Sequence, residues 1–122
     1  MKIYIGHSRQ YNFKNELYAP LRKSKLGQHE LILPHEFSDQ SFDSKSVIPT
    51  CDLVVAEVSY PSTGLGIELG WANCFKVPIL CIHNKGTSIS GSLKALTKNY
   101  VEYENPNDMV SKLQLFLAHF EN

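Results

Sequence analysis

Residues 52–58 read DLVVAEV. After Asp52, every side chain of this run is apolar except that of Glu57. A run without polar alternation is typical of a strand that is covered on both faces. Residues 78–83, PILCIH, form a second run of this kind. Between the two runs, apolar residues at helical spacing predict a helix over 65–75. This strand–helix–strand order indicates a parallel sheet with helices packed on its faces.

The same alternation continues on both sides of this unit. Strands are expected over 2–6, 30–33 and 100–103, and helices over 12–25, 39–48, 92–97 and 106–120. Pro20 predicts a kink or a boundary inside the first helix. The expected fold is α/β: one doubly wound, Rossmann- or flavodoxin-like domain over residues 1–122, with a five-stranded parallel sheet flanked by helices. Ligands of such sheets bind at the carboxyl ends of the strands.

Composition narrows the classes of partner. Lys and Arg number 12, as do Asp and Glu, and this balance argues against a polymeric nucleic acid as partner. No stretch approaches the roughly 18 apolar residues that span a bilayer, so no membrane association is expected. Three cysteines among core-forming residues are typical of a reducing compartment, which predicts a cytoplasmic protein. The histidines lack metal-ligand spacing, so neither a metal site nor another cofactor is expected.

Residues 59–70, SYPSTGLGIELG, place glycines at 64, 66 and 70. They differ from a dinucleotide-binding fingerprint because the third glycine comes one residue late. Glu68, expected in the first helical turn, would also compete with a pyrophosphate for the positive end of the helix. An ionised carboxylate beside a glycine-lined space instead suits a glycosidic nucleophile. The alternative is that Glu68 only caps its helix.

The run over 52–83 resembles the nucleoside 2-deoxyribosyltransferase family and is most similar there to the 2'-deoxynucleoside 5'-phosphate N-hydrolases. The shared pattern is AEV-x-x-P-S-x-G-x-G-x-E-L-G, which begins here at residue 56. The resemblance implies that the enzyme is an N-glycosidase that hydrolyses the base–sugar bond of (2'-deoxy)nucleoside 5'-monophosphates. It also makes Glu68 the catalytic nucleophile, which forms a covalent glycosyl-enzyme.

The resemblance further implies that the 5'-phosphate is cradled by the loop of Gly6, His7, Ser8 and Arg9, by Ser62 and by Ser92. Gly64 and Gly66, which line the space beside Glu68, complete the expected substrate-binding set. Arginine offers phosphate a bidentate fork, and serine hydroxyls complete the cradle. The family's equivalent of Ser92 comes from the neighbouring subunit, so a homodimer is expected, with Trp71 and Phe75 as interface residues. The family loop continues with glycines after the arginine, whereas this chain continues with Gln10, Tyr11 and Asn12.

A second carboxylate would assist departure of the base. The family carries an aspartate on the helix before the DLVVAEV-like strand, and a gapless count places it at Ser44. A slip of one residue gives Asp43, which is the expected catalytic partner of Glu68, with Asp39 in reserve. Glu57 is a separate question, because a charge near the end of an apolar strand is costly unless it is paired. It either supports the site or faces solvent at the strand tip.

Two other functions stay open at this point. One is a nucleoside 2-deoxyribosyltransferase that exchanges bases between deoxynucleosides, which would need no phosphate cradle. The other is a non-catalytic nucleotide-binding or sensor domain, whose binding would survive loss of the Glu68 carboxylate. All three functions take a small nucleotide or nucleoside. The sequence leaves open the preferred base, the choice between ribose and 2-deoxyribose, and the physiological role.

Overall fold

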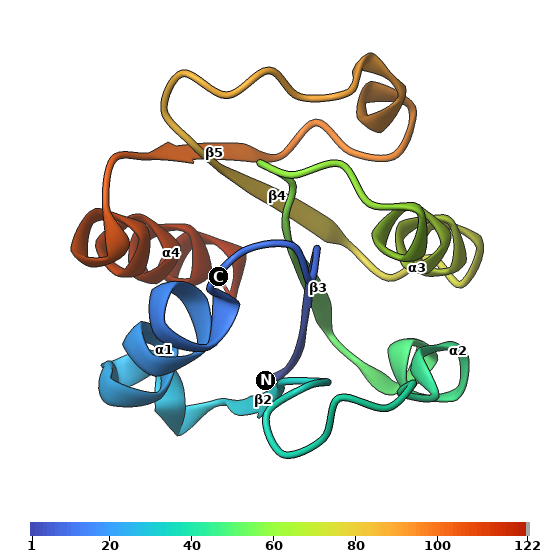
Figure 1. Ribbon diagram of the computed structural model, residues 1–122, viewed down its shortest axis with the longest axis horizontal. Coiled ribbons are helices and arrows are strands. Elements are labelled where there is room, and N and C mark those ends of the chain that lie inside the picture. The colour runs from blue at the N-terminus through green and yellow to red at the C-terminus, as the bar shows by residue number, and fades with distance from the viewer. Residues whose placement is uncertain (122) are drawn as a thin grey trace.

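The computed structural model describes residues 1–121 and contains one sheet of five parallel strands (Figure 1). The strands are β1 (Lys2–His7), β2 (Glu30–Ile32), β3 (Leu53–Glu57), β4 (Ile79–Asn84) and β5 (Tyr100–Tyr103). Their order in the sheet is β2-β1-β3-β4-β5, and every neighbouring pair is parallel. The expected doubly wound α/β fold is therefore confirmed.

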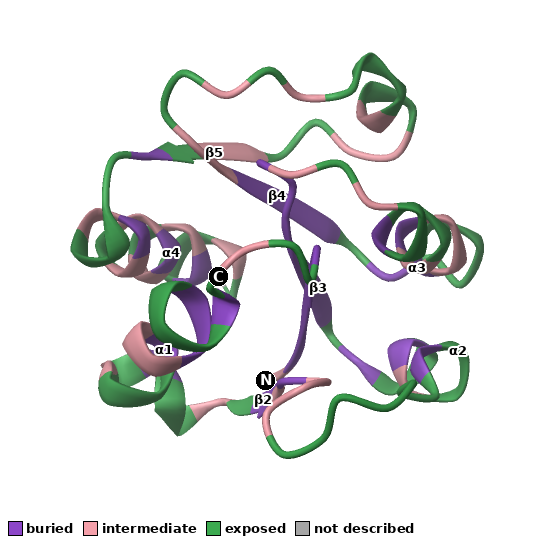
Figure 2. Ribbon diagram, viewed as in Figure 1, coloured by how far each residue is buried: buried purple, intermediate pink, exposed green. Residues whose placement is uncertain are grey.

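Helices cover both faces of this sheet. In chain order they are η1 (Lys14–Tyr18), α1 (Ala19–Lys23), η2 (Lys25–Gln28), α2 (Ser44–Val47), η3 (Ile48–Thr50), α3 (Thr63–Cys74), η4 (Gly91–Ala95) and α4 (Pro106–Phe120). Figure 1 shows α1 and α4 on one face and α2 and α3 on the other. The central strands are accordingly buried, while the outer sides of the helices are exposed (Figure 2). No helix within residues 1–121 is long and apolar enough to cross a membrane.

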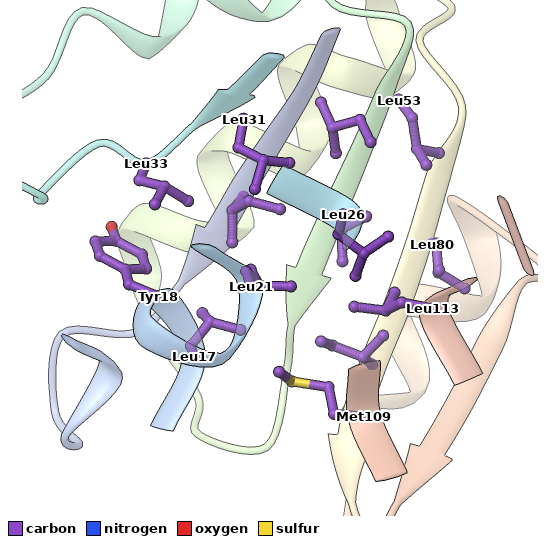
Figure 3. Packing of buried hydrophobic residues seen from close by; sticks show 14 of the residues in the cluster. Leu17, Tyr18, Leu21, Leu26, Leu31, Leu33, Leu53, Leu80, Met109 and Leu113 are labelled. Carbon is purple, nitrogen blue, oxygen red and sulfur yellow. The ribbon is translucent and has the colours of Figure 1, made fainter. Parts of the chain in front are cut away.

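Two hydrophobic layers hold the helices to the sheet. The layer under α1 and α4 packs Leu17 and Leu21 with Met109 and Leu113 around β1, β3 and β4 (Figure 3). The layer on the opposite face is formed by alternate residues of the same strands, together with buried residues of α3 such as Leu69. Because β3 contributes to both layers, all its residues must be buried, as its continuous apolar run predicts.

The helix expected over 65–75 begins two residues earlier, at Thr63. Ser62 is its N-cap, and the Ser62 Oγ accepts a hydrogen bond from the Leu65 N–H at 3.3 Å. Gly64, which precedes the expected helix, lies within its first turn. Glu68 therefore lies in the second turn of α3 rather than the first, so the helix end acts on its carboxylate less directly than expected.

Two other helices are shorter than expected. The segment over 39–48 is helical only from Ser44, because the carboxylate of Asp43 caps α2 by accepting from the Ser46 N–H at 3.3 Å. The segment over 12–25 divides into a π-helical turn and α1, which carries Pro20 in its first turn. Proline lacks the N–H that a continuous helix would need at this point, so the boundary expected from Pro20 is present.

The strand order also locates the binding crevice. The chain leaves β1 towards β2 on one side and leaves β3 towards β4 on the other, so the loops after β1 and β3 diverge. His7 and Glu57, the last residues of these strands, are aligned in the β1–β3 register. A crevice between the two loops is where doubly wound sheets bind ligands.

Candidate active site

A cleft of about 270 Å³ opens at the carboxyl ends of β1 and β3. Its lining combines ionisable, hydroxyl and apolar groups: His7, Arg9, His35, Ser41, Phe42, Ser44, Ser62, Gly64, Leu65, Ile67, Glu68 and Trp71. Glu68 is its central carboxylate, and Arg9 and Ser62 lie on the same lining. The cleft thus brings together the expected nucleophile and four members of the expected substrate-binding set, His7, Arg9, Ser62 and Gly64.

The Glu68 carboxylate is held by two hydroxyl donors. The Tyr4 hydroxyl and the Ser44 Oγ both donate to Glu68 Oε2, and they lie 2.7 Å from each other. Tyr4 is fully buried in β1, and Ser44 is the buried first residue of α2. Burial, aided by the nearby Glu68 charge, raises the pKa of Tyr4 above its ordinary value, so the phenol stays protonated and donates.

The other carboxylate oxygen, Oε1, faces Gly6. A Cβ at Gly6 would lie 3.8 Å from Glu68 Oε1 and only 2.9 Å from Leu65 Cδ1. Gly6 is therefore needed for close approach between β1 and α3. Both donors are on Oε2, so Oε1 has no hydrogen-bond partner within residues 1–121.

Gly64 and Gly66, two of the three glycines of the expected motif, serve a different purpose. Neither Gly64 nor Gly66 has a positive φ, so backbone conformation does not require glycine at either position. A Cβ at Gly66 would meet nothing within 4 Å, and one at Gly64 would reach only the Ser62 Oγ at 4.0 Å. These glycines keep space open on the two sides of the α3 N-terminus.

Some of the residues expected to hold phosphate are accessible to a ligand, and others are engaged in hydrogen bonds within the protein. Arg9 is half-exposed on the cleft and lies 4.0 Å from the carboxylate of Asp39, which is 78% exposed. Ser62 Oγ accepts from the backbone of α3, so its own hydrogen is available to a ligand. Of the side chains of this set that line the cleft, Arg9 and Ser62 have donors available to a ligand, whereas both ring nitrogens of His7 are engaged.

His7 and Ser8 are built into the scaffold instead. His7 is buried, with Nδ1–H donating to the Ser8 carbonyl at 2.8 Å and Nε2 accepting from the Tyr18 hydroxyl at 2.5 Å. Burial lowers the pKa of His7 to about 4, so the ring is neutral at pH 7. Ser8 is also buried, and its Oγ accepts from the Gln10 N–H at 3.1 Å. These two residues shape the loop that presents Arg9.

Ser92 lies away from this cleft. It is exposed on η4 and lines a separate cavity of about 490 Å³, which it shares with Ser62 and Gly66. Ser62 borders both hollows because it stands at the tip of α3. The structure therefore places Ser92 beyond Ser62, on the side of α3 that faces the 85–97 loop.

The structure brings Ser44, and not Asp43, to Glu68. Asp43 is exposed, and its carboxylate accepts from the backbone of α2. Asp39 lies near Arg9 and Lys14, at 4.0 Å from each. The gapless count to Ser44 was the sequence signal for this contact. The role of Tyr4 carried no such signal, because an aromatic residue in a buried strand is equally typical of core.

The fold and this carboxylate-centred cleft define the class of protein, an α/β enzyme with its site at the switch point of a parallel sheet. The CMP N-glycosidase of Clostridium botulinum has the same fold: its structure superposes with a TM-score of 0.72 over 95% of this chain and 99% of its own, at 20% identity. No protein-family model matches the chain.

Relatives give the family. A protein of Syntrophotalea carbinolica, provisionally named 2'-deoxynucleoside 5'-phosphate N-hydrolase 1, is 30% identical over 100 residues, which cover 70% of each chain. The 5-hydroxymethyl-dUMP N-hydrolase of Branchiostoma floridae is 38% identical over 61 residues, which cover 45% of this chain and 58% of that protein. The chain therefore belongs to the 2'-deoxynucleoside 5'-phosphate N-hydrolase family, and the expectation of an enzyme of the N-glycosidase class is confirmed.

Proposed function

We propose that this enzyme hydrolyses the base–sugar bond of (2'-deoxy)nucleoside 5'-monophosphates, with Glu68 as nucleophile and a glycosyl-enzyme as intermediate. The observation that carries the proposal is the state of the Glu68 carboxylate on the cleft: Oε2 is held by Tyr4 and Ser44, while Oε1 accepts no hydrogen bond within residues 1–121. A nucleophile that is already oriented loses little freedom on reaction. The names of the relatives, which refer to nucleotides, support the substrate class.

In the first step, Glu68 Oε1 forms a bond to the anomeric carbon while the carbon–nitrogen bond to the base breaks. The base leaves with the electron pair of that bond and takes up one proton. The transition state has oxocarbenium character, which a nearby carboxylate stabilises. The hydrogen bonds from Tyr4 and Ser44 keep Oε2 fixed as the charge on the carboxylate is consumed.

In the second step, water attacks the anomeric carbon and restores the Glu68 carboxylate. The hydroxyl of the water remains on the sugar, and its proton balances the one taken up by the base. Overall, one water is added across the N-glycosidic bond. Transfer to a second base in place of water would be the deoxyribosyltransferase reaction.

The 5'-phosphate lies, in this proposal, between Arg9 and the N-terminus of α3. Arg9 supplies a charged fork, and Ser62 supplies a hydroxyl together with the free backbone N–H groups of the first helical turn. Glu68 lines the same cleft, so one ligand can reach both ends. The phosphate end of the site is then the half that separates a nucleotide hydrolase from an enzyme of free nucleosides.

We further propose a homodimer in which Ser92 of the partner subunit completes this phosphate site. Ser92 is exposed on η4 and is separated from Arg9 within its own subunit by α3. The outer side of α3 supports the dimer, because Ile67 is 49% exposed and Phe75 is 42% exposed there. Two-fold contact between such apolar faces is the commonest way to cover them.

Release of free base from a panel of nucleosides and their 5'-monophosphates tests the proposal. We expect monophosphates to be used far better, and we expect Glu68→Gln to lower kcat by at least about 10³-fold because the nucleophile is lost. Glu16→Gln, the same change at an exposed position on η1, is the control and should match the parent. Near-parental turnover by folded Glu68→Gln would refute the mechanism. A preference of the parent enzyme for free nucleosides would favour the transferase.

A further inference from the structure

We propose that Glu57 is a positioning residue that holds the 58–62 loop, and with it Ser62, in the place where the 5'-phosphate binds. This inference rests on the proposed function, because it concerns the phosphate end of that site. Glu57 is the last residue of β3 and is 1% exposed, so it acts on substrate only through its neighbours. Neither step of the proposed reaction uses this buried carboxylate.

Both Glu57 oxygens accept hydrogen bonds. The Ser59 N–H donates to Oε1 at 2.5 Å, and the Ser59 Oγ donates to Oε2 at 3.0 Å. The Tyr103 hydroxyl, from β5, also donates to Oε2. Burial, together with this hydrogen bond, raises the pKa of Tyr103, so the phenol remains a donor. Only a carboxylate accepts on both of its oxygens in this way.

Asn84, at the end of β4, closes these contacts into a network. Its backbone N–H donates to the Ser59 Oγ at 2.8 Å, and its Nδ2 donates to the Tyr103 hydroxyl at 3.4 Å. The Glu57 network (Glu57, Ser59, Asn84 and Tyr103) thus joins the carboxyl ends of three adjacent strands. The loop that follows β3 starts from this fixed point.

Stability alone does not explain a charge at this position. None of the ion pairs within residues 1–121 includes Glu57. Burial of a carboxylate without a cation opposes folding, and a neutral side chain of similar size would avoid that cost. Charge-assisted hydrogen bonds are stronger and more directional than neutral ones. The charge of Glu57 therefore fixes the position of Ser59 more precisely than a neutral side chain would.

The loop transmits this placement to the phosphate end. Two residues separate Ser59 from Ser62, which caps α3 and lines the cleft. Between them, Tyr60 stacks on Tyr11, with ring centroids 4.6 Å apart and planes at 24°. Tyr11 belongs to the loop that carries Arg9. The loops that carry Ser62 and Arg9 are therefore both held by the Glu57 network, the second of them through the contact between Tyr60 and Tyr11.

The test is the preference of the enzyme for a monophosphate over the matching nucleoside, measured as the ratio of their kcat/KM values. In Glu57→Gln, the amide N–H₂ replaces one acceptor and meets the hydroxyls of Ser59 and Tyr103. We expect this ratio to fall by about 10-fold or more, because loss of a charge-assisted contact has effects of this size. The fall should lie in KM for the monophosphate, with kcat/KM for the nucleoside within about twofold of the parent.

The Ki of inorganic phosphate gives a second readout that needs no nucleoside turnover, and it should rise by a similar factor. Glu102→Gln, the same change at an exposed position of β5, is the matched control and should leave both readouts unchanged. A general structural defect would lower kcat/KM for both substrates together, so equal losses for the two would overturn the inference. An unchanged ratio in folded Glu57→Gln would do the same.

If Glu57→Gln does not fold, Tyr103→Phe and Ser59→Ala carry the test, since each removes one donor from the carboxylate. Both should lower the monophosphate preference by a smaller factor, and parental ratios in both would overturn the inference. A parent enzyme that shows no preference for monophosphates would instead refute the proposed function. That outcome is read from the parent alone, so the two failures are distinguishable.

Discussion

Ser44 donates a hydrogen bond to Glu68, and it does so at the position where the family carries an aspartate by a gapless count. The carboxylate of the adjacent Asp43 is directed to the backbone of its own helix. The site therefore has one carboxylate and two hydroxyl groups at its centre. Proton transfer to the departing base is not assigned to Asp43 in our proposal.

Ser44→Ala should lower kcat by about 10- to 100-fold, because removal of one donor to a charged group has an effect of roughly 1.5–3 kcal/mol. Alanine keeps the helical conformation of α2, so the change acts on the carboxylate and not on the helix. Steady-state kinetics of base release give kcat, and thermal unfolding checks that the variant is folded.

Asp43→Asn is the matched control for this position. Asparagine caps helices as well as aspartate does, so we expect kcat within about twofold of the parent and little change in stability. A 100-fold loss in Asp43→Asn, together with full activity in Ser44→Ala, would restore the second catalytic carboxylate to Asp43.

Gly6→Ala should lower kcat/KM by more than about 10-fold, because the new methyl group enters the space between β1 and Glu68 Oε1. It also meets Leu65 Cδ1 at 2.9 Å, so Leu65 must move and the melting temperature should fall by several degrees. Base release and thermal unfolding measure the two effects separately.

Gly6→Ala combined with Leu65→Val separates crowding of the core from crowding of the carboxylate. Valine removes the Leu65 Cδ1 that the methyl group meets, so the double variant should regain most of its stability relative to Gly6→Ala. Activity should stay low. Parental activity in either variant would show that the space over Gly6 is not used by the substrate.

The free energy of unfolding should fall as the pH drops from about 6.5 to about 4, because of His7. The folded ring has a pKa of about 4, against 6.5 ordinarily, so only the unfolded chain takes up this proton in that range. The contribution is complete above pH 6.5 and amounts to about 3 kcal/mol when fully lost. Urea unfolding at several pH values measures the slope.

His7→Asn should be less stable at pH 7, since the Tyr18 hydroxyl loses its acceptor, and should show a shallower slope between pH 4.5 and 6.5. His119→Gln removes an exposed histidine from α4 and should retain the parental slope. Equal slopes in His7→Asn and the parent would show that the buried ring titrates normally.

Sedimentation at micromolar concentration should give twice the chain mass, and mixing of two weak variants should restore activity. Glu68→Ala lacks the nucleophile, and Ser92→Trp blocks the contribution to the partner. A mixed dimer has one intact site, so an equal mixture should reach about a quarter of the parental activity. Base release after mixing and re-equilibration measures the gain.

A chain with both changes, mixed with Glu68→Ala, is the control and should show no gain, because every dimer then lacks an intact site. A monomer with full activity would refute both the dimer and the role of Ser92. If mixing restores activity at dilutions where only monomers sediment, the sharing of active sites between subunits is refuted.

The strands were the most predictable part of this fold. The apolar run that follows Asp52 is buried throughout Leu53–Glu57, and few structures other than a central strand satisfy such a run. Helix boundaries were harder, because Gly64 has low helix propensity and the N-cap contact of Ser62 outweighs it. The π-helical turn before Pro20 follows from where the chain must pack, which local sequence does not encode.

Within the site, Glu68 could be predicted from its motif, but its environment could not. Tyr4 and Ser44 reach its carboxylate from elements 64 and 24 residues away in sequence. The buried state of His7 likewise depends on Phe13 and Tyr18, which pack against its ring from a later segment. Long-range contacts of this kind set the chemistry of a side chain, and periodicity carries no information about them.

The strand order β2-β1-β3-β4-β5 has a consequence for how such an enzyme can diversify. Both hydrophobic layers are complete beneath the carboxyl edge of the sheet, whereas the groups facing the cleft come largely from loops and helix tips above it. Insertions, deletions and substitutions in those loops can therefore accumulate without loss of folding stability. Evolution, or directed selection in the laboratory, can therefore vary the groups that face the cleft while the scaffold is inherited intact.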